Sequence, residues 1–123
     1  MKIAIFLFGS KVSPLFYFSP ELWIITEKNG EVVRQEKISL ENFTISQRIE
    51  MLALTGVAKM VCGGIHDFRL AQLRNMGIDV FHNVIGEADI ALGNLLKGQL
   101  RPGSLCEEKR KGNALPTKRN ERG

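Results

Sequence analysis

The sequence predicts an α/β fold, in which helices flank one mixed sheet of five strands. Three observations predict it: an almost continuous apolar run at the start, two β-type segments around an Asn29-Gly30 turn, and strand and helix patterns that alternate afterwards. A continuous apolar run is typical of a central strand that is covered on both faces. Alternating strands and helices are typical of parallel strands joined by crossovers. The length of 123 residues suits one domain.

Met1–Phe8 is the predicted central strand. Leu22–Thr26 and Val32–Ile38 are predicted to form a hairpin, because Asn29-Gly30 readily adopts the positive φ angles of a tight turn. The connections between these three segments are short, so we expect an antiparallel meander.

The first helix is predicted to begin after Thr44, with Gln47 three residues later completing a capping box. It should end at Gly56, because glycine favours the left-handed position after a last turn. Its sheet-facing residues recur at helical spacing and are Ile45, Ile49, Leu52 and Ala53.

The later segments complete the order β-β-β-α-β-α-β-α. Val57–Cys62 and Ile78–Phe81 are predicted strands, and Phe68–Met76 and Ala88–Leu96 are predicted helices. Right-handed crossovers would place the new strands parallel to the first. Numbered along the chain, the five strands should therefore have the order 3-2-1-4-5.

The net positive charge of the chain comes from its last residues. Residues 1–100 carry ten basic and ten acidic side chains (10 − 10 = 0), whereas residues 101–123 carry seven and three (7 − 3 = +4). We therefore expect a folded domain over 1–100 and a basic, flexible C-terminal tail over 101–123. A balanced body argues against nucleic acid as a partner.

The location expected from the sequence is the cytoplasm. No apolar run approaches the ~20 residues that a membrane helix needs, so no membrane association is expected. An export signal is not recognised, and two cysteines do not suggest a disulfide framework.

A ligand site is predicted where the first and fourth strands end side by side, because open α/β sheets bind ligands at such a switch point. Glycines there allow close backbone approach, and a helix start offers free N–H groups to an anion. The candidate cofactor-binding residues are Gly9, Ser10, Ser13, Gly63 and Gly64.

Cys62 and His66 lie four positions apart at the turn after the fourth strand, and thiolate and imidazole both suit iron. With His82, which follows the fifth strand, they are the candidate metal ligands. The alternatives are a buried structural cysteine and two ordinary polar histidines. The position of Cys106 in the tail leaves its role open.

The apolar segment Leu15–Phe18 has two interpretations. It either folds over the end of the sheet and closes the core, or it forms a wall beside the ligand or a contact in a homodimer.

The sequence lacks the motifs that several classes of enzyme require. The sequence contains no GxxxxGK[ST] phosphate loop, no GxGxxG fingerprint and no GxSxG elbow. The first strand carries no carboxylate with which to hold magnesium. We therefore expect a protein that is not an enzyme, and a Cys62-dependent enzyme is the weakest alternative.

The segments MKIAIFLFGSKVSPLF, the following hairpin, and MVCGGI with its helix and GIDVF resemble the dinitrogenase iron–molybdenum cofactor biosynthesis family over residues 1–100. The resemblance implies a ribonuclease-H-like fold. It also implies a non-enzymatic carrier that binds an iron–sulfur or iron–molybdenum-type cofactor, or its precursor, and delivers this metallocluster to a protein partner. The alternative is a protein-interaction or regulatory module with a vestigial cofactor cleft and a basic tail.

Overall fold

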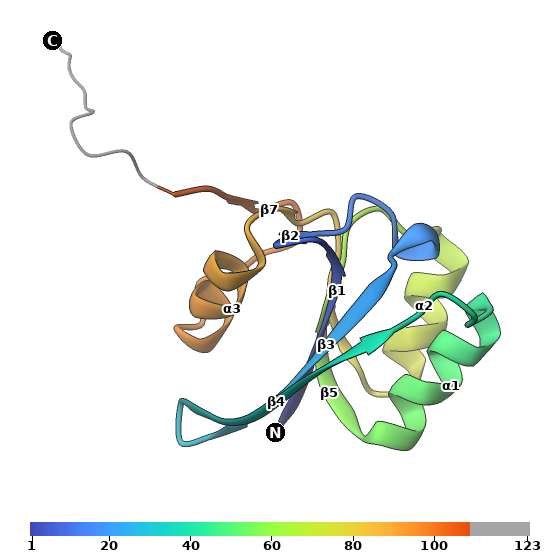
Figure 1. Ribbon diagram of the computed structural model, residues 1–123, viewed down its shortest axis with the longest axis horizontal. Helices are drawn as coiled ribbons and strands as arrows, with labels where there is room; N and C mark the ends of the chain where they lie inside the picture. Colours follow the sequence, from blue (N-terminus) through green and yellow to red (C-terminus); the bar gives the residue numbers. More distant parts are fainter. Residues whose placement is uncertain (109–123) are drawn as a thin grey trace, which may run out of the picture.

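The strand β1 lies at the centre of a mixed sheet in the computed structural model, which describes residues 1–108 (Figure 1). β3 pairs antiparallel with one side of β1, and β5 pairs parallel with the other. β4 and β6 extend the sheet to its two edges. The bounds are β1 (Lys2–Phe8), β3 (Glu21–Lys28), β4 (Glu31–Ser39), β5 (Val57–Val61) and β6 (Asp79–Phe81). The mixed α/β fold and the antiparallel pairing of the first three long strands are confirmed.

The sheet has six strands, so the predicted count of five is wrong. The sixth strand, β2 (Lys11–Val12), folds back on β1 and pairs Val12 with Leu7. It lies off the path β4-β3-β1-β5-β6 and has no place in the predicted order 3-2-1-4-5. A strand of two residues is too short to show a periodicity in the sequence. Its pairing with β1 depends on the turn at Gly9, where φ is 64°.

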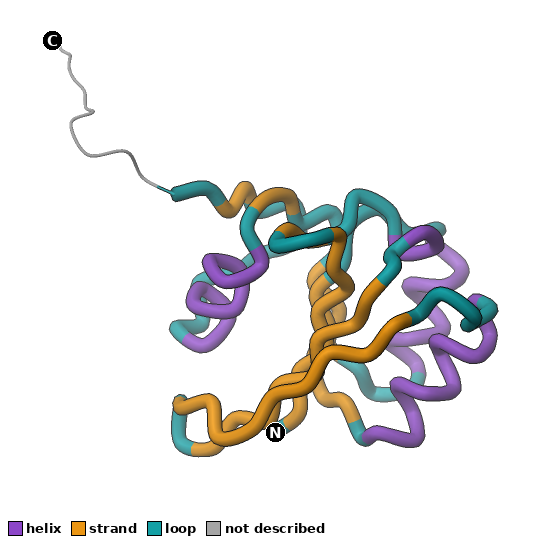
Figure 2. The backbone as a smooth tube through the Cα atoms, in the orientation of Figure 1, coloured by secondary structure: helices purple, strands orange, loops and turns teal. Residues whose placement is uncertain are grey.

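Two layers of helices cover the two faces of the sheet (Figures 1 and 2). α1 (Ile45–Thr55) and α2 (Asp67–Asn75) pack on the face that carries Ala4 and Phe6. α3 (Ala88–Leu96) packs on the opposite face, with Ile3, Ile5 and Leu7. Burial on both faces explains the continuous apolar run in β1.

The predicted turn and helix caps are present. Asn29 and Gly30 have φ angles of 55° and 83° at the tip of the β3–β4 hairpin. Thr44 and Gln47 form both hydrogen bonds of the capping box, and Gly56 adopts the left-handed conformation after α1.

The folded part of the chain continues beyond residue 100. β7 (Ile85–Gly86) pairs in parallel with β8 (Leu105–Cys106), and Cys106 is fully buried against the α3 side of the core. The pairing brings this segment, which follows the expected boundary at residue 100, back onto the body of the domain. The rest of the expected tail, 109–123, lies outside the described residues. None of the helices within residues 1–108 is long and apolar enough to cross a membrane.

Candidate functional site

The loops that follow β1 and β5 lie in direct contact, as the switch-point argument predicted. The Gly64 N–H donates to the Pro14 carbonyl at 2.7 Å, and the Phe16 N–H donates to the Gly64 carbonyl at 3.0 Å. Gly63 lies so close to Pro14 that a Cβ would be 2.3 Å from the Pro14 oxygen. Only glycine fits at this crossing of two backbones.

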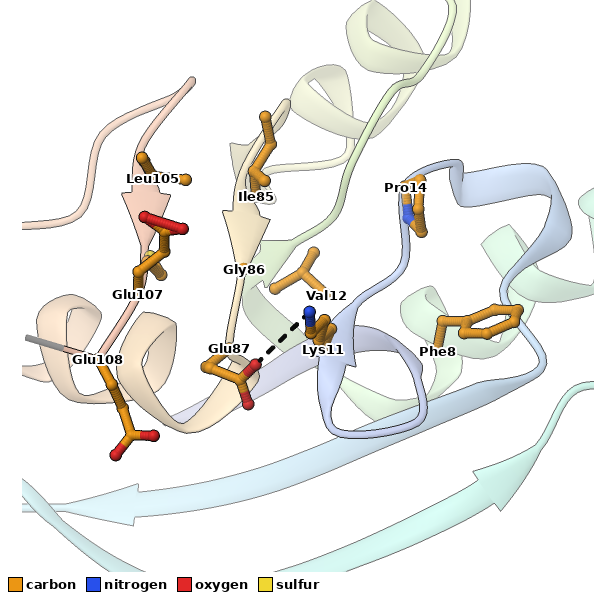
Figure 3. A pocket seen from close by; sticks show the side chains of 11 residues that line it. Phe8, Lys11, Val12, Pro14, Ile85, Gly86, Glu87, Leu105, Glu107 and Glu108 are labelled. Carbon is orange, nitrogen blue, oxygen red and sulfur yellow. Dashed lines mark ion pairs between the residues drawn. The ribbon is translucent and has the colours of Figure 1, made fainter. Parts of the chain in front are cut away.

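A groove opens beside this contact, and Pro14 borders each of its three parts. The largest part is a cleft of about 710 Å³ between β2, β7 and β8 (Figure 3). A hollow of about 340 Å³ reaches Gly63 and Gly64, and one of about 220 Å³ is lined by Phe8, Leu15 and Phe18. We call these three connected parts the groove.

The side chains of the largest cleft carry more negative than positive charge. Lys11 is its one basic lining residue, against Glu87, Glu107 and Glu108 (1 − 3 = −2). The Lys11 Nζ lies 4.0 Å from a carboxylate oxygen of Glu87, and the Ser10 hydroxyl donates to that carboxylate at 3.3 Å. The cleft therefore does not attract anions by its net charge.

The predicted anion-binding residues are only partly available. Ser13, Gly63 and Gly64 line the groove. The Ser13 hydroxyl, however, donates to the Leu15 carbonyl at 3.1 Å, and its N–H donates to the Phe6 carbonyl at 2.8 Å.

Gly9 and Ser10 lie instead in the exposed turn between β1 and β2. Of the N–H groups that were predicted to hold an anion, those of Gly64 and Ser13 donate to backbone carbonyls within the protein instead.

Cys62, the first of the predicted iron ligands, does not present its side chain to the groove. Its exposed fraction is 0%, and it packs with Phe6 and Met60 beneath α1 and α2. Burial raises the pKa of the Cys62 thiol to about 12, so the thiol is neutral at physiological pH. A buried neutral thiol is a poor metal ligand.

The two histidines are not brought together with Cys62. The backbone N–H of His66 donates to the Tyr17 hydroxyl at 2.7 Å, and the centroids of the His66 and Tyr17 rings lie 4.8 Å apart. His82 contacts the Asn83 amide through Nδ1 at 3.1 Å. Among residues 1–108, no three His, Cys, Asp or Glu side chains are grouped to hold a metal ion. Cys62, His66 and His82 therefore form no such group within residues 1–108, and their role as metal ligands stays a prediction.

Arg48 supports the site and was not predicted. Its buried guanidinium donates to the carbonyls of Phe16 at 3.2 Å, Ser19 at 2.8 Å and Leu40 at 3.4 Å. Desolvation lowers the pKa of Arg48 from its ordinary value. The sequence held a signal for this role, because residue 48 falls on the apolar face of the helix.

The segment Leu15–Phe18 has one side chain in the core and two exposed at the groove. Phe16 is fully buried and closes the core, edge-on to Phe6 with ring centroids 4.8 Å apart. Phe18 is 75% exposed and Leu15 is 44% exposed, and both line the groove. The short 3-10 helix Phe16–Phe18 separates the inward from the outward ring.

Three solved structures share this fold. The protein PH0822 matches with a TM-score of 0.75 and 18% identity, over 83% of this chain and 94% of that one. MJ0327 of Methanocaldococcus jannaschii, named as a proposed dinitrogenase, matches in its NMR structure with a TM-score of 0.69 and 20% identity, over 83% and 92%. Its crystal structure gives 0.69 and 21%, over 81% and 91%.

No protein-family model and no curated protein matches the sequence. At these identities, the structural likeness establishes the fold.

Proposed function

We propose that this chain is a non-enzymatic binding protein, similar to those of nitrogenase cofactor biosynthesis, which carries an iron–sulfur or iron–molybdenum-type cofactor or its precursor. The observation that carries the proposal is the groove beside the Pro14–Gly64 contact, at the carboxyl ends of β1 and β5. This is the position at which open α/β sheets bind ligands. The shared fold of MJ0327, named as a proposed dinitrogenase, supports the choice of cargo.

The cargo would be held by surface contacts rather than by ligation through Cys62. Lys11 is the cation of the largest cleft, and its partner Glu87 lies at the outer limit of an ion pair, so an anionic cargo could take the ammonium group from it. The apolar walls of the smaller hollows would exclude water from the contact. A carrier has to release its cargo, and the absence of a ligand cage among residues 1–108 agrees with this.

Anaerobic equilibrium dialysis of the full chain against a synthetic [4Fe–4S] cluster tests the proposal. Iron per chain and the absorption spectrum are the readouts. We expect Cys62→Ala to retain as much cluster as the wild type, and Lys11→Glu to bind about tenfold more weakly, since ~1.4 kcal/mol corresponds to that factor. Lys28→Glu, an exposed change at the end of β3, is the matched control and should bind normally.

Retention by the wild type that is no greater than by Lys11→Glu would contradict the proposal. Loss of the cluster from a correctly folded Cys62→Ala variant would contradict binding by surface contacts. The cluster should be recovered chemically unchanged, and its conversion would argue for an enzyme instead.

A further inference from the structure

The groove changes its chemistry along its length. At one end, Glu107 and Glu108 follow β8, and Glu87, directly after β7, lines the same cleft (Figure 3). At the other end, Phe8 and Pro14 lie on the far side of the cleft and lead into the apolar hollow. An occupant that fits both ends would be basic where it meets β8 and apolar beyond Pro14.

The apolar end is unusually exposed for side chains of this kind. Phe8 is 62% exposed and Phe18 is 75% exposed, and together with Leu15 they line the hollow of about 220 Å³. Clustered exposed apolar side chains of this kind mark an interaction site. The size of the hollow suits a single aliphatic side chain better than a large planar ligand.

The chain itself continues from the acidic end of the groove. Residues 109–123 carry six basic side chains and one acidic side chain (6 − 1 = +5). Lys109-Arg110-Lys111 comes first, and Ala114-Leu115-Pro116 follows after two residues. The order from basic to apolar along the sequence therefore matches the order from acidic to apolar along the groove.

The length of this segment also fits. Leu115 is seven residues beyond Glu108, and an extended chain of that length spans up to ~25 Å. Glu108, Phe8 and Pro14 line one and the same cleft, and the apolar hollow begins at Phe8 and Pro14. The hollow is thus within reach of the Leu115 side chain.

We propose that the segment 109–123 of the same chain is the occupant of the groove. Its first basic residues lie beside Glu87 and Glu107, and Leu115 inserts into the hollow between Phe8 and Phe18. The docking itself does not depend on the cargo. Its consequence, which rests on the proposed function, is that cargo and tail compete for the groove, so that removing the tail contact raises the apparent affinity for cargo.

Paramagnetic relaxation in the full chain tests the docking. A spin label is attached to Thr117→Cys, and labelling is selective because Cys62 and Cys106 are both 0% exposed. We expect the amide signals of Phe8, Leu15 and Phe18 to lose most of their intensity. Adding Leu115→Asp should restore these signals. Leu54→Asp, at a leucine that is 82% exposed on α1, is the matched control and should leave the loss unchanged.

Three results would overturn the proposal. One is full signal intensity at Phe8 and Phe18 in the labelled chain. Another is a loss that Leu115→Asp does not relieve. The last is a loss seen when spin-labelled chains are mixed with isotope-labelled chains that carry no spin label, because the occupant would then be the tail of a second copy. None of these results depends on cluster retention, so the outcome is separate from that of the carrier experiment.

Discussion

Gly63 and Pro14 lie in backbone contact, with room for a hydrogen atom but not for a side chain between them. A Cβ on Gly63 would lie 2.3 Å from the carbonyl oxygens of both Pro14 and Ser13. The neighbouring Gly64 N–H donates to Pro14 at 2.7 Å. This contact joins the two loops at the groove, because neither backbone can move away without breaking the hydrogen bond.

Gly63→Ala should therefore lower the free energy of unfolding by about 1–3 kcal/mol, since the added methyl group meets backbone atoms that cannot yield. Urea unfolding measures this loss. Gly93→Ala is the control: nothing lies within 4 Å of its Cβ position in α3, so alanine should stabilise the helix by about 0.5–1 kcal/mol. Equal effects of the two substitutions would contradict the close contact at Gly63.

Arg48→Met should lower the free energy of unfolding by about 1–3 kcal/mol, because it leaves buried carbonyl groups without donors. Hydrogen exchange should also become faster in the segment Phe16–Ser19, which the guanidinium holds. Arg34→Met, at an exposed position of β4, should change the stability by no more than about 0.5 kcal/mol. Normal exchange at Phe16–Ser19 in Arg48→Met would show that Arg48 does not fix this loop.

The Cys62 thiol predicts a fall in stability at alkaline pH. Burial holds its pKa at about 12, above the ordinary value of 9.0 that it takes in the unfolded chain. Between pH 7 and pH 10 the unfolded chain loses this proton while the folded chain keeps it. The free energy of unfolding should therefore fall by about 1.4 kcal/mol over this interval through Cys62 alone.

The comparison of the wild type with Cys62→Ala isolates this contribution, because Cys106 and every other titrating group are common to both. The stability of the wild type should fall more steeply with pH. Parallel curves would mean that the Cys62 thiol titrates in the folded protein near its ordinary pKa.

The Lys11–Glu87 ion pair should contribute little to stability. Its atoms are 4.0 Å apart and the Lys11 side chain is 66% exposed, so Lys11→Met should cost no more than about 1 kcal/mol by thermal unfolding. A larger loss would indicate that Lys11 also supports the packing of β2 against α3. The combined charge swap of Lys11→Glu and Glu87→Lys should unfold like the wild type.

Local patterns in the sequence were sufficient for most of the fold. The Asn29-Gly30 turn, the Thr44 capping box and the left-handed Gly56 all formed as predicted. Each depends on residues that are close in the chain, where backbone preference and one or two hydrogen bonds decide the outcome. The two-residue strands could not be predicted: β2 is too short to show a periodicity, and β7 and β8 are strands only because they pair with each other.

The sequence by itself determined the five strands along the main path of the sheet and that the loops after β1 and β5 meet at one edge. Only the tertiary structure decided what those loops offer to a ligand. The N–H groups of Gly64 and Ser13 donate to backbone carbonyls of the protein. The side chain of Cys62 lies in the core and does not face the groove. The physical reason is that an N–H group has one proton to donate and a side chain faces one side of the backbone, and packing across the molecule decides both.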